Sequence, residues 1–140
     1  MTRADRWGWC GAAAALLLAA GIGGAAAQPC GDDATQAELN ACAGRAVDAA
    51  EADLAQMSEE ILARLPDEEA RAGFQAAQEA WTAYRDAECT FAASGVAGGS
   101  IYPLVWGECI ASLTDERAAT LDGFLHCEEG DTSCPVPPAQ

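Results

Sequence analysis

Lysine is absent from this chain of 140 residues, and histidine occurs once. All seven basic residues are arginines, against 22 acidic residues, so the formal charge is −15 at pH 7. Binding to nucleic acid or to anionic lipid needs a basic surface, and this composition excludes both classes of partner. A single histidine also excludes the paired histidines of an HExxH zinc site. The composition favours a basic partner instead.

An uncharged run follows two arginines at the N-terminus. Arg3 and Arg6 precede a stretch without charge over residues 7–27, which ends in three alanines. This pattern is typical of a cleavable secretory signal peptide, so we expect residues 1–27 to be removed after Ala27. A retained membrane anchor is the alternative, because the run is about long enough to span a bilayer. The mature chain would be periplasmic or secreted, and loss of Arg3, Arg6 and Asp5 would change the formal charge from −15 to −16.

Six of the seven cysteines lie beyond this cleavage point. An even number of cysteines in an exported chain predicts disulfides. A zinc site is a poor alternative, because the sequence contains no CxxC pair. Sequence order favours three local bridges, although other connectivities stay open. The expected pairs are Cys30–Cys42, Cys89–Cys109 and Cys127–Cys134.

The first helical pattern begins at Thr35. Thr35 and Glu38 have capping-box spacing, in which each side chain bonds the backbone N–H of the other residue. Apolar residues then recur every three or four positions, which predicts one amphipathic helix of about 45 Å. Small residues in its first half would let a neighbouring helix approach closely. The predicted buried stripe is Leu39, Ala43, Ala46, Ala50, Leu54, Met57, Ile61 and Leu65.

Two further helical patterns follow Pro66, and no strand-type alternation occurs. The second pattern starts at residues 67–69, and its apolar face is predicted to lie along the first helix. A glycine-rich loop over 94–100 separates it from a third helix over 102–126. A break is predicted near 112–114, where Thr114 would cap a fresh helical segment. The predicted fold class is all-α: a small antiparallel bundle of two long helices plus a third bent helix, with a domain over 28–126 and an irregular tail over 127–140. The stripe predicted for the second helix is Ala70, Phe74, Ala77, Trp81, Tyr84, Glu88 and Phe91.

Trp81, Tyr84, Arg85 and Asp86 form the densest group of residue types that are typical of binding hot spots. One interpretation is a binding face. The other, which we favour, is packing, with Arg85 paired to a carboxylate on a neighbouring helix. Arg117 has the same two interpretations.

The tail carries Glu128, Glu129 and Asp131 inside the expected Cys127–Cys134 ring. A short closed loop loses little entropy on binding, so this acidic ring is a second candidate contact. A solvated tail held by its bridge is the alternative, and the one we favour. No calcium-loop motif of the DxDxDG type is present. Carboxylate pairs arise by chance in so acidic a chain, so we predict no metal, no cofactor and no catalytic residue.

Spaced motifs run through most of the mature chain. They are Thr35-Gln-x-Glu-Leu-Asn-x-Cys42, Ala77-Gln-x-x-Trp81-x-x-Tyr-Arg85-Asp-x-Glu-Cys89, Gly98-Gly-Ser100, Cys109 and Thr114-x-x-Arg117-x-x-x-Leu121. Together they resemble the family built on the N-terminal domain of the lysozyme inhibitor LprI. The resemblance implies a small, helical, cysteine-bridged exported domain. The chain departs from the family where many relatives have an Asp-x-x-Leu-Asn-x-x-Tyr pattern, and the Cys127–Cys134 ring is an extension.

The leading hypothesis for function joins this resemblance to the acidic composition. We expect an exported, lysozyme-inhibitor-like binding domain that contacts a basic protein such as lysozyme. The alternative is a periplasmic structural or adaptor domain without inhibitory activity. Neither is an enzyme. Beyond the signal peptide no membrane association is expected, and the sequence leaves the oligomeric state open.

Overall fold

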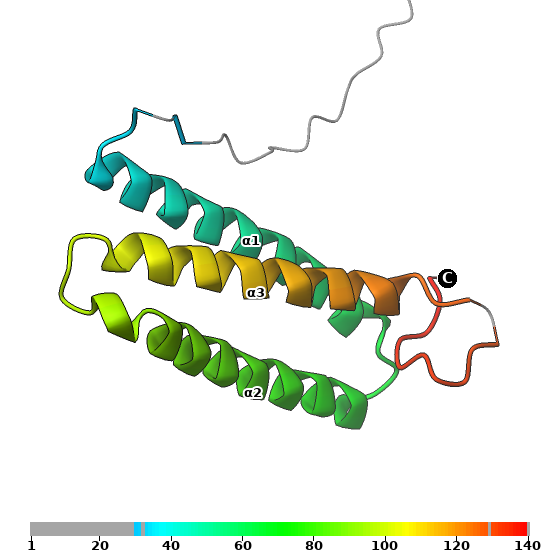
Figure 1. The fold of residues 1–140 in the computed structure, drawn as a ribbon. Helices are drawn as coiled ribbons and strands as arrows, with labels where there is room; N and C mark the ends of the chain where they lie inside the picture. The colour runs from blue at the N-terminus through cyan, green and yellow to red at the C-terminus, as the bar shows by residue number, and fades with distance from the viewer. Residues whose placement is uncertain (1–29, 32, 129, 140) are drawn as a thin grey trace, which may run out of the picture.

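A computed structural model describes residues 30–31, 33–128 and 130–139, so the expected signal peptide lies outside the described residues. Over those ranges the chain forms α1 (Gln36–Arg64), α2 (Glu68–Ala92), a short 3-10 helix η1 (Ser94–Val96) and α3 (Tyr102–Leu125), without a strand (Figure 1). α1 and α3 run in one direction and α2 runs in the other. The all-α antiparallel prediction is confirmed.

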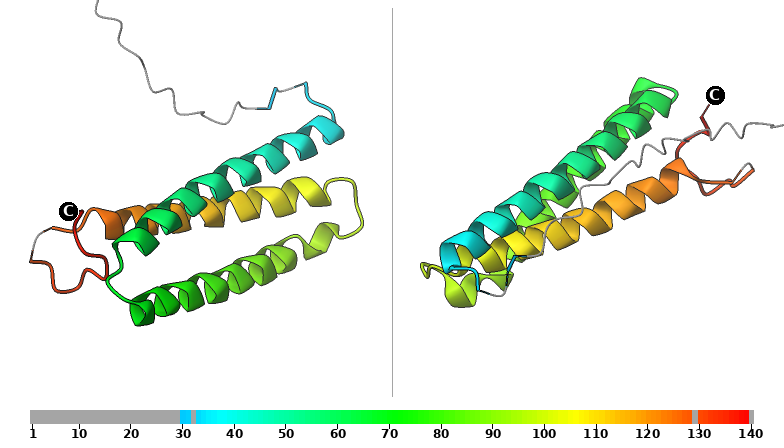
Figure 2. Two further views of the ribbon diagram at one scale, coloured as in Figure 1. Left: turned by 180° about the vertical axis from the view of Figure 1, so that it is seen from behind. Right: turned by 90° about the horizontal axis from the view of Figure 1, so that it is seen from above.

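α3 organises the bundle. It packs closely along α1 and more loosely along α2, while the backbones of α1 and α2 approach each other little. Figure 2 shows the three helices from behind and from above. The prediction that the second helix lies along the first was wrong for most of its length, because α3 takes that position and long polar side chains bridge α1 to α2. Only Ala70 and Phe74, near the start of α2, pack against the apolar cluster that contains Ile61 of α1.

Both ends of α1 are held by side chains. The backbone N–H of Thr35 donates to Glu38 Oε2 at 2.7 Å, and that of Glu38 donates to Thr35 Oγ1 at 3.4 Å, so the predicted capping box is confirmed. At the other end Arg71 of α2 donates from Nη2 to the Leu65 carbonyl at 2.8 Å and from Nε to the Leu62 carbonyl at 3.3 Å. A cation suits this position, because the last carbonyls of a helix are unpaired and carry its negative pole.

The small-residue half of α1 meets a glycine of α3. A Cβ added to Gly107 would lie 3.1 Å from the Cβ of Ala43, which is tighter than an ordinary van der Waals contact. Both residues are buried. The close approach predicted for this half of α1 is confirmed, and its partner is α3.

The largest apolar cluster lies at the opposite end of the bundle. Ile61 of α1 and Leu121 of α3 are fully buried there, and Val136 of the tail joins them with only 4% of its surface exposed. The tail is irregular, as predicted. The favoured interpretation of the tail as a solvated segment held by its bridge was incomplete, because Val136 is buried in the core.

α3 is continuous, so the break predicted near residues 112–114 is absent. Thr114 does not cap a new helix. Its hydroxyl donates to the Ile110 carbonyl one turn earlier at 2.7 Å, and the side chain is fully buried. A helix tolerates threonine in its interior when the hydroxyl finds such a carbonyl.

Three disulfides tie the bundle together, and they are the predicted pairs Cys30–Cys42, Cys89–Cys109 and Cys127–Cys134. The second bridge spans the glycine-rich connection between α2 and α3. In that connection Gly98 has φ +75°, the left-handed conformation that glycine adopts without strain. Asn40 of α1 donates to the Ser100 carbonyl at 2.9 Å and fixes the connection against the first helix.

The stripe predicted for the second helix is only partly buried. Tyr84 is 55% exposed and Phe91 76% exposed, whereas the buried residues of α2 are Arg85 and Cys89. The Cys89 bridge and the polar partners of Arg85 turn those two residues inward. Tyr84 and Phe91 are therefore turned out of the bundle, whereas Phe74 and Trp81 of the same stripe stay half-buried.

Candidate functional site

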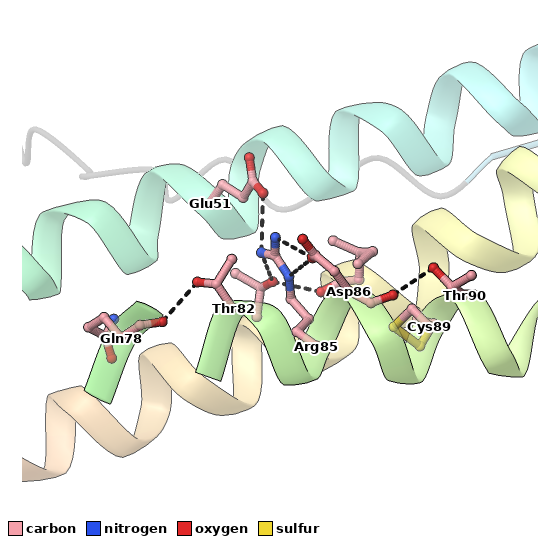
Figure 3. A network of polar contacts seen from close by, with 10 residues as sticks. Glu51, Gln78, Thr82, Arg85, Asp86, Cys89 and Thr90 are labelled. Carbon is pink, nitrogen blue, oxygen red and sulfur yellow. Dashed lines mark hydrogen bonds and ion pairs between the residues drawn. A yellow bond between two sulfur atoms is a disulfide. The ribbon is translucent and has the colours of Figure 1, made fainter. Parts of the chain in front are cut away.

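Arg85 lies at the centre of a polar layer that joins all three helices. Its side chain is buried, and Nη1 donates to Glu51 of α1 at 3.2 Å and to Thr114 of α3 at 3.1 Å. Nε donates to the neighbouring Asp86 at 2.9 Å (Figure 3). The favoured interpretation of Arg85 as an inter-helix pairing residue agrees with this geometry.

A second polar layer lies two turns along α2. Arg117 of α3 donates from Nε to Gln78 Oε1 at 2.8 Å, and Gln78 Nε2 donates to the Ser58 hydroxyl of α1 at 3.3 Å. Ser58 in turn donates to the Leu54 carbonyl at 2.8 Å. Burial lowers the pKa of the Arg117 guanidinium, since a charged group is disfavoured away from water.

Trp81 joins the two layers. The guanidinium carbon of Arg85 lies 5.3 Å from the centre of its ring, and that of Arg117 lies 5.9 Å away. Both distances fall within the range of a cation–π contact. The indole is thus held between a guanidinium of its own helix and one of α3, which restrains it as a half-buried part of the surface.

Two hollows lie beside α2 and α3, with α1 and the tail also contributing to the second, and Arg117 lines both. The first has a volume of about 260 Å³, and its lining is Trp81, Tyr84, Leu113, Glu116, Arg117 and Thr120. The second has a volume of about 310 Å³ and is mostly apolar. Its lining is Ile61, Leu65, Ala70, Phe74, Ala77, Arg117, Phe124, Pro135 and Val136. We call the two together the α2–α3 groove.

The acidic ring lies beyond the C-terminal end of α3, away from the middle of α2 that carries Trp81 (Figure 1). Glu128 and Asp131 are exposed, and Glu129 lies outside the described residues. The Ser133 hydroxyl and N–H donate to Asp131 at 2.6 and 2.8 Å and lower the pKa of its carboxyl. The structure therefore brings Trp81, Arg85 and Arg117 together but leaves the ring separate.

The arginines and the acids are segregated. Arg71, Arg85 and Arg117 bond other helices, and Arg64 donates to the Leu125 carbonyl at 2.9 Å and pairs with Glu60. Every Asp and Glu that the structure describes is exposed. Arg45 is the one exposed arginine in the same residues. The exposed formal charges are consequently almost all negative.

Sequence reasoning missed three participants in the polar layers. Glu51, Ser58 and Gln78 were given no role, although Gln78 stands in the motif before Trp81. Thr114 was assigned to a helix cap rather than to the interior. The arginines of α2 and α3 could have pointed to them, because a buried guanidinium needs polar hydrogen-bond partners on the helices beside it.

No group of three or more His, Cys, Asp and Glu residues in the described ranges is placed to hold a metal ion. None of the described helices is long and apolar enough to cross a membrane. His126 is the C-cap residue of α3, and its Nδ1 lies 2.9 Å from the Asp122 carbonyl.

The family described as "Lysozyme inhibitor LprI" matches residues 27–121. The chain belongs to the LprI family. A relative in Rhizobium meliloti (strain 1021), named as uncharacterized protein R02472, is 30% identical over 132 residues, which cover 84% of this chain and 95% of the relative. No solved structure matches.

The spaced motifs named in the sequence analysis coincide with the polar layers and the bridges. Gln78, Trp81 and Arg85 stand in the α2 motif, and Thr114 and Arg117 stand in the α3 motif. The α1 motif supplies the capping box and Asn40, which holds the Ser100 carbonyl. The motif residues of this LprI family member thus hold three helices in register, and the α2–α3 groove is built on them.

Proposed function

We propose that the mature protein is exported and inhibits lysozyme by protein–protein contact in the periplasm or outside the cell. The single observation that carries this proposal is membership of the LprI family, whose description is that of a lysozyme inhibitor. The family description is that of an inhibitor and not of an enzyme, which agrees with the role proposed here.

The segregation of charge supports a basic partner. The described arginines other than Arg45 point into the bundle or cap helix ends, so they neutralise little of the exposed acidic surface. An anionic exterior attracts a cationic protein from a distance and raises its association rate. At an ionic strength of 0.1 M, charges more than about 10 Å apart are largely screened from each other. Binding to a basic protein would therefore weaken as the salt concentration rises.

The three disulfides support export. Bridges persist in oxidising compartments such as the bacterial periplasm, and small exported domains use them to supplement a modest core. In this protein the bridges hold the N-terminal segment, the connection between α2 and α3, and the tail. A pre-ordered surface loses less entropy on binding than a flexible one.

A turbidity assay of lysozyme on bacterial cell walls tests the proposal. The oxidised mature protein should inhibit lysis at micromolar concentration in low salt, and the inhibition should weaken at moderate salt. An unrelated protein of similar negative charge is the control, and it should inhibit much less. Absence of inhibition at micromolar protein would contradict the proposal and favour an adaptor role in the periplasm.

A further inference from the structure

An aromatic edge remains uncovered between α2 and α3. Tyr84 is 55% exposed, and the restrained Trp81 beside it shares a hollow of about 260 Å³. Trp81 and Tyr84 belong to the residue types that dominate binding hot spots, and rigid aromatic rings lose little entropy when they are covered. Resting on the proposed function, we propose that the α2–α3 groove is the surface that contacts the cationic protein.

The first hollow has the chemistry of a site for a lysine or arginine side chain. Both guanidinium contacts on Trp81 come from the protein's own arginines, so the indole serves as a fixed wall. The exposed ring of Tyr84 stays open to a cation from outside. Glu116 lines the same hollow and supplies a carboxylate for an ion pair, while Leu113 packs against the aliphatic part of the side chain.

The second hollow accepts an apolar side chain. Its volume is about 310 Å³, and Phe74, Phe124 and Val136 contribute to its largely apolar lining. Arg117 stands between the two hollows. Its Nε and Nη2 are taken by Gln78, whereas its Nη1 has no partner among the described residues and can donate to a carbonyl of the incoming chain. The groove therefore fits a segment with a cationic residue close to an apolar one.

Charge selects this occupant over a second copy of the chain. Glu116 is part of the groove, and Glu88 lies one turn beyond Tyr84 on α2; both are exposed. Two such surfaces would repel each other, because the formal charge of the full sequence is −15 and no exposed arginine lines the groove. A basic protein has the complementary sign.

Calorimetric titration of purified lysozyme with the oxidised mature protein tests the proposal. Tyr84→Ser and Glu116→Lys change exposed side chains in the groove and should each weaken binding at least about tenfold at low salt. Glu59→Lys makes the same charge change on the outer face of α1 and should weaken binding less than about threefold. Unchanged far-UV circular dichroism and melting temperature would establish that each variant is folded.

The outcomes separate this proposal from the proposed function. If the wild-type protein binds and all variants bind equally well, the groove assignment is wrong and lysozyme binding stands. A larger loss for Glu128→Lys than for both groove variants would place the contact on the acidic ring and overturn the groove. If the wild-type protein does not bind, the proposed function fails and this proposal fails with it. If sedimentation analysis shows that the wild-type protein is a dimer and that Tyr84→Ser is a monomer, the groove binds a second copy of the chain and the proposal is wrong.

Discussion

Arg85 of α2 and Thr114 of α3 meet in the interior of the bundle, where the guanidinium Nη1 donates to the buried hydroxyl at 3.1 Å. The Thr114 hydroxyl donates its own hydrogen bond to the Ile110 carbonyl, so its oxygen is free to accept the bond from Arg85. The contact fixes which face of α2 turns inward. Because that face carries a cation, the aromatic side chains of α2 lie at the rim and form the groove.

Removal of the Thr114 hydroxyl should destabilise the fold. Thr114→Val keeps the shape of the side chain but leaves one buried N–H of Arg85 without an acceptor, which costs about 1–3 kcal/mol. Thr120→Val is the matched control, because Thr120 also donates to the carbonyl one turn earlier but is exposed. Its effect should stay within about 0.5 kcal/mol. Urea unfolding measures both, and equal effects would show that the Arg85 contact contributes nothing.

The stripe of α1 and that of α2 show what sequence patterns predict and what they miss. None of the eight predicted stripe residues of α1 is exposed, since an apolar repeat on a helix that packs along its length reports burial directly. On α2 the same rule held for Ala70, Phe74 and Trp81, which are half-buried, and failed for the other four stripe residues, which are exposed. The hydrogen bonds of the buried Arg85 and the Cys89–Cys109 bridge decide which face of α2 turns inward, against the aromatic repeat. A pattern of hydrophobicity contains no information on hydrogen bonds to residues distant in sequence. The groove could not be predicted for this reason.

Two glycines of α3 should respond in opposite ways to substitution. Gly123 is exposed and has open space around an added Cβ, so Gly123→Ala should raise stability by about 0.5–1 kcal/mol through helix propensity. Gly107→Val should lower it by about 1–3 kcal/mol, because Ala43 already lies 3.1 Å from the first added atom. Thermal unfolding compares the two. A stabilising Gly107→Val would mean that α1 and α3 are not in close contact there.

The tail should contribute to stability through Val136. Val136→Ala removes two buried carbon atoms and should cost about 1–2 kcal/mol. Thr132→Ala changes an exposed residue of the same tail and serves as the control, with no expected change beyond about 0.5 kcal/mol. If both variants melt at the wild-type temperature, the tail is only tethered by its bridge and does not complete the core.

Acid should weaken the start of α1. Hydrogen bonds from the Thr35 hydroxyl and N–H hold the pKa of the Glu38 carboxyl below its ordinary value of 4.5. A lowered folded pKa means that the ionised form stabilises the protein above the unfolded pKa, and this contribution is lost as pH falls through the folded pKa. The wild-type protein should therefore lose more stability than Glu38→Gln between neutral pH and about pH 3. Glu59→Gln changes a glutamate without a hydrogen bond, so its free energy of unfolding should depend on pH as that of the wild-type protein does. If all three proteins show the same pH dependence, the capping role of Glu38 is contradicted.

Nuclear magnetic resonance of the labelled, oxidised protein during titration with lysozyme tests the central claim most directly. The indole N–H of Trp81 and the amides around Tyr84 and Glu116 should shift, while amides on the outer face of α1 near Glu59 should stay in place. These shifts should shrink as salt is added, because screening weakens the attraction between an acidic surface and a basic protein. Shifts confined to α1 or to the acidic ring would contradict the groove, and a spectrum unchanged by excess lysozyme would contradict lysozyme binding itself.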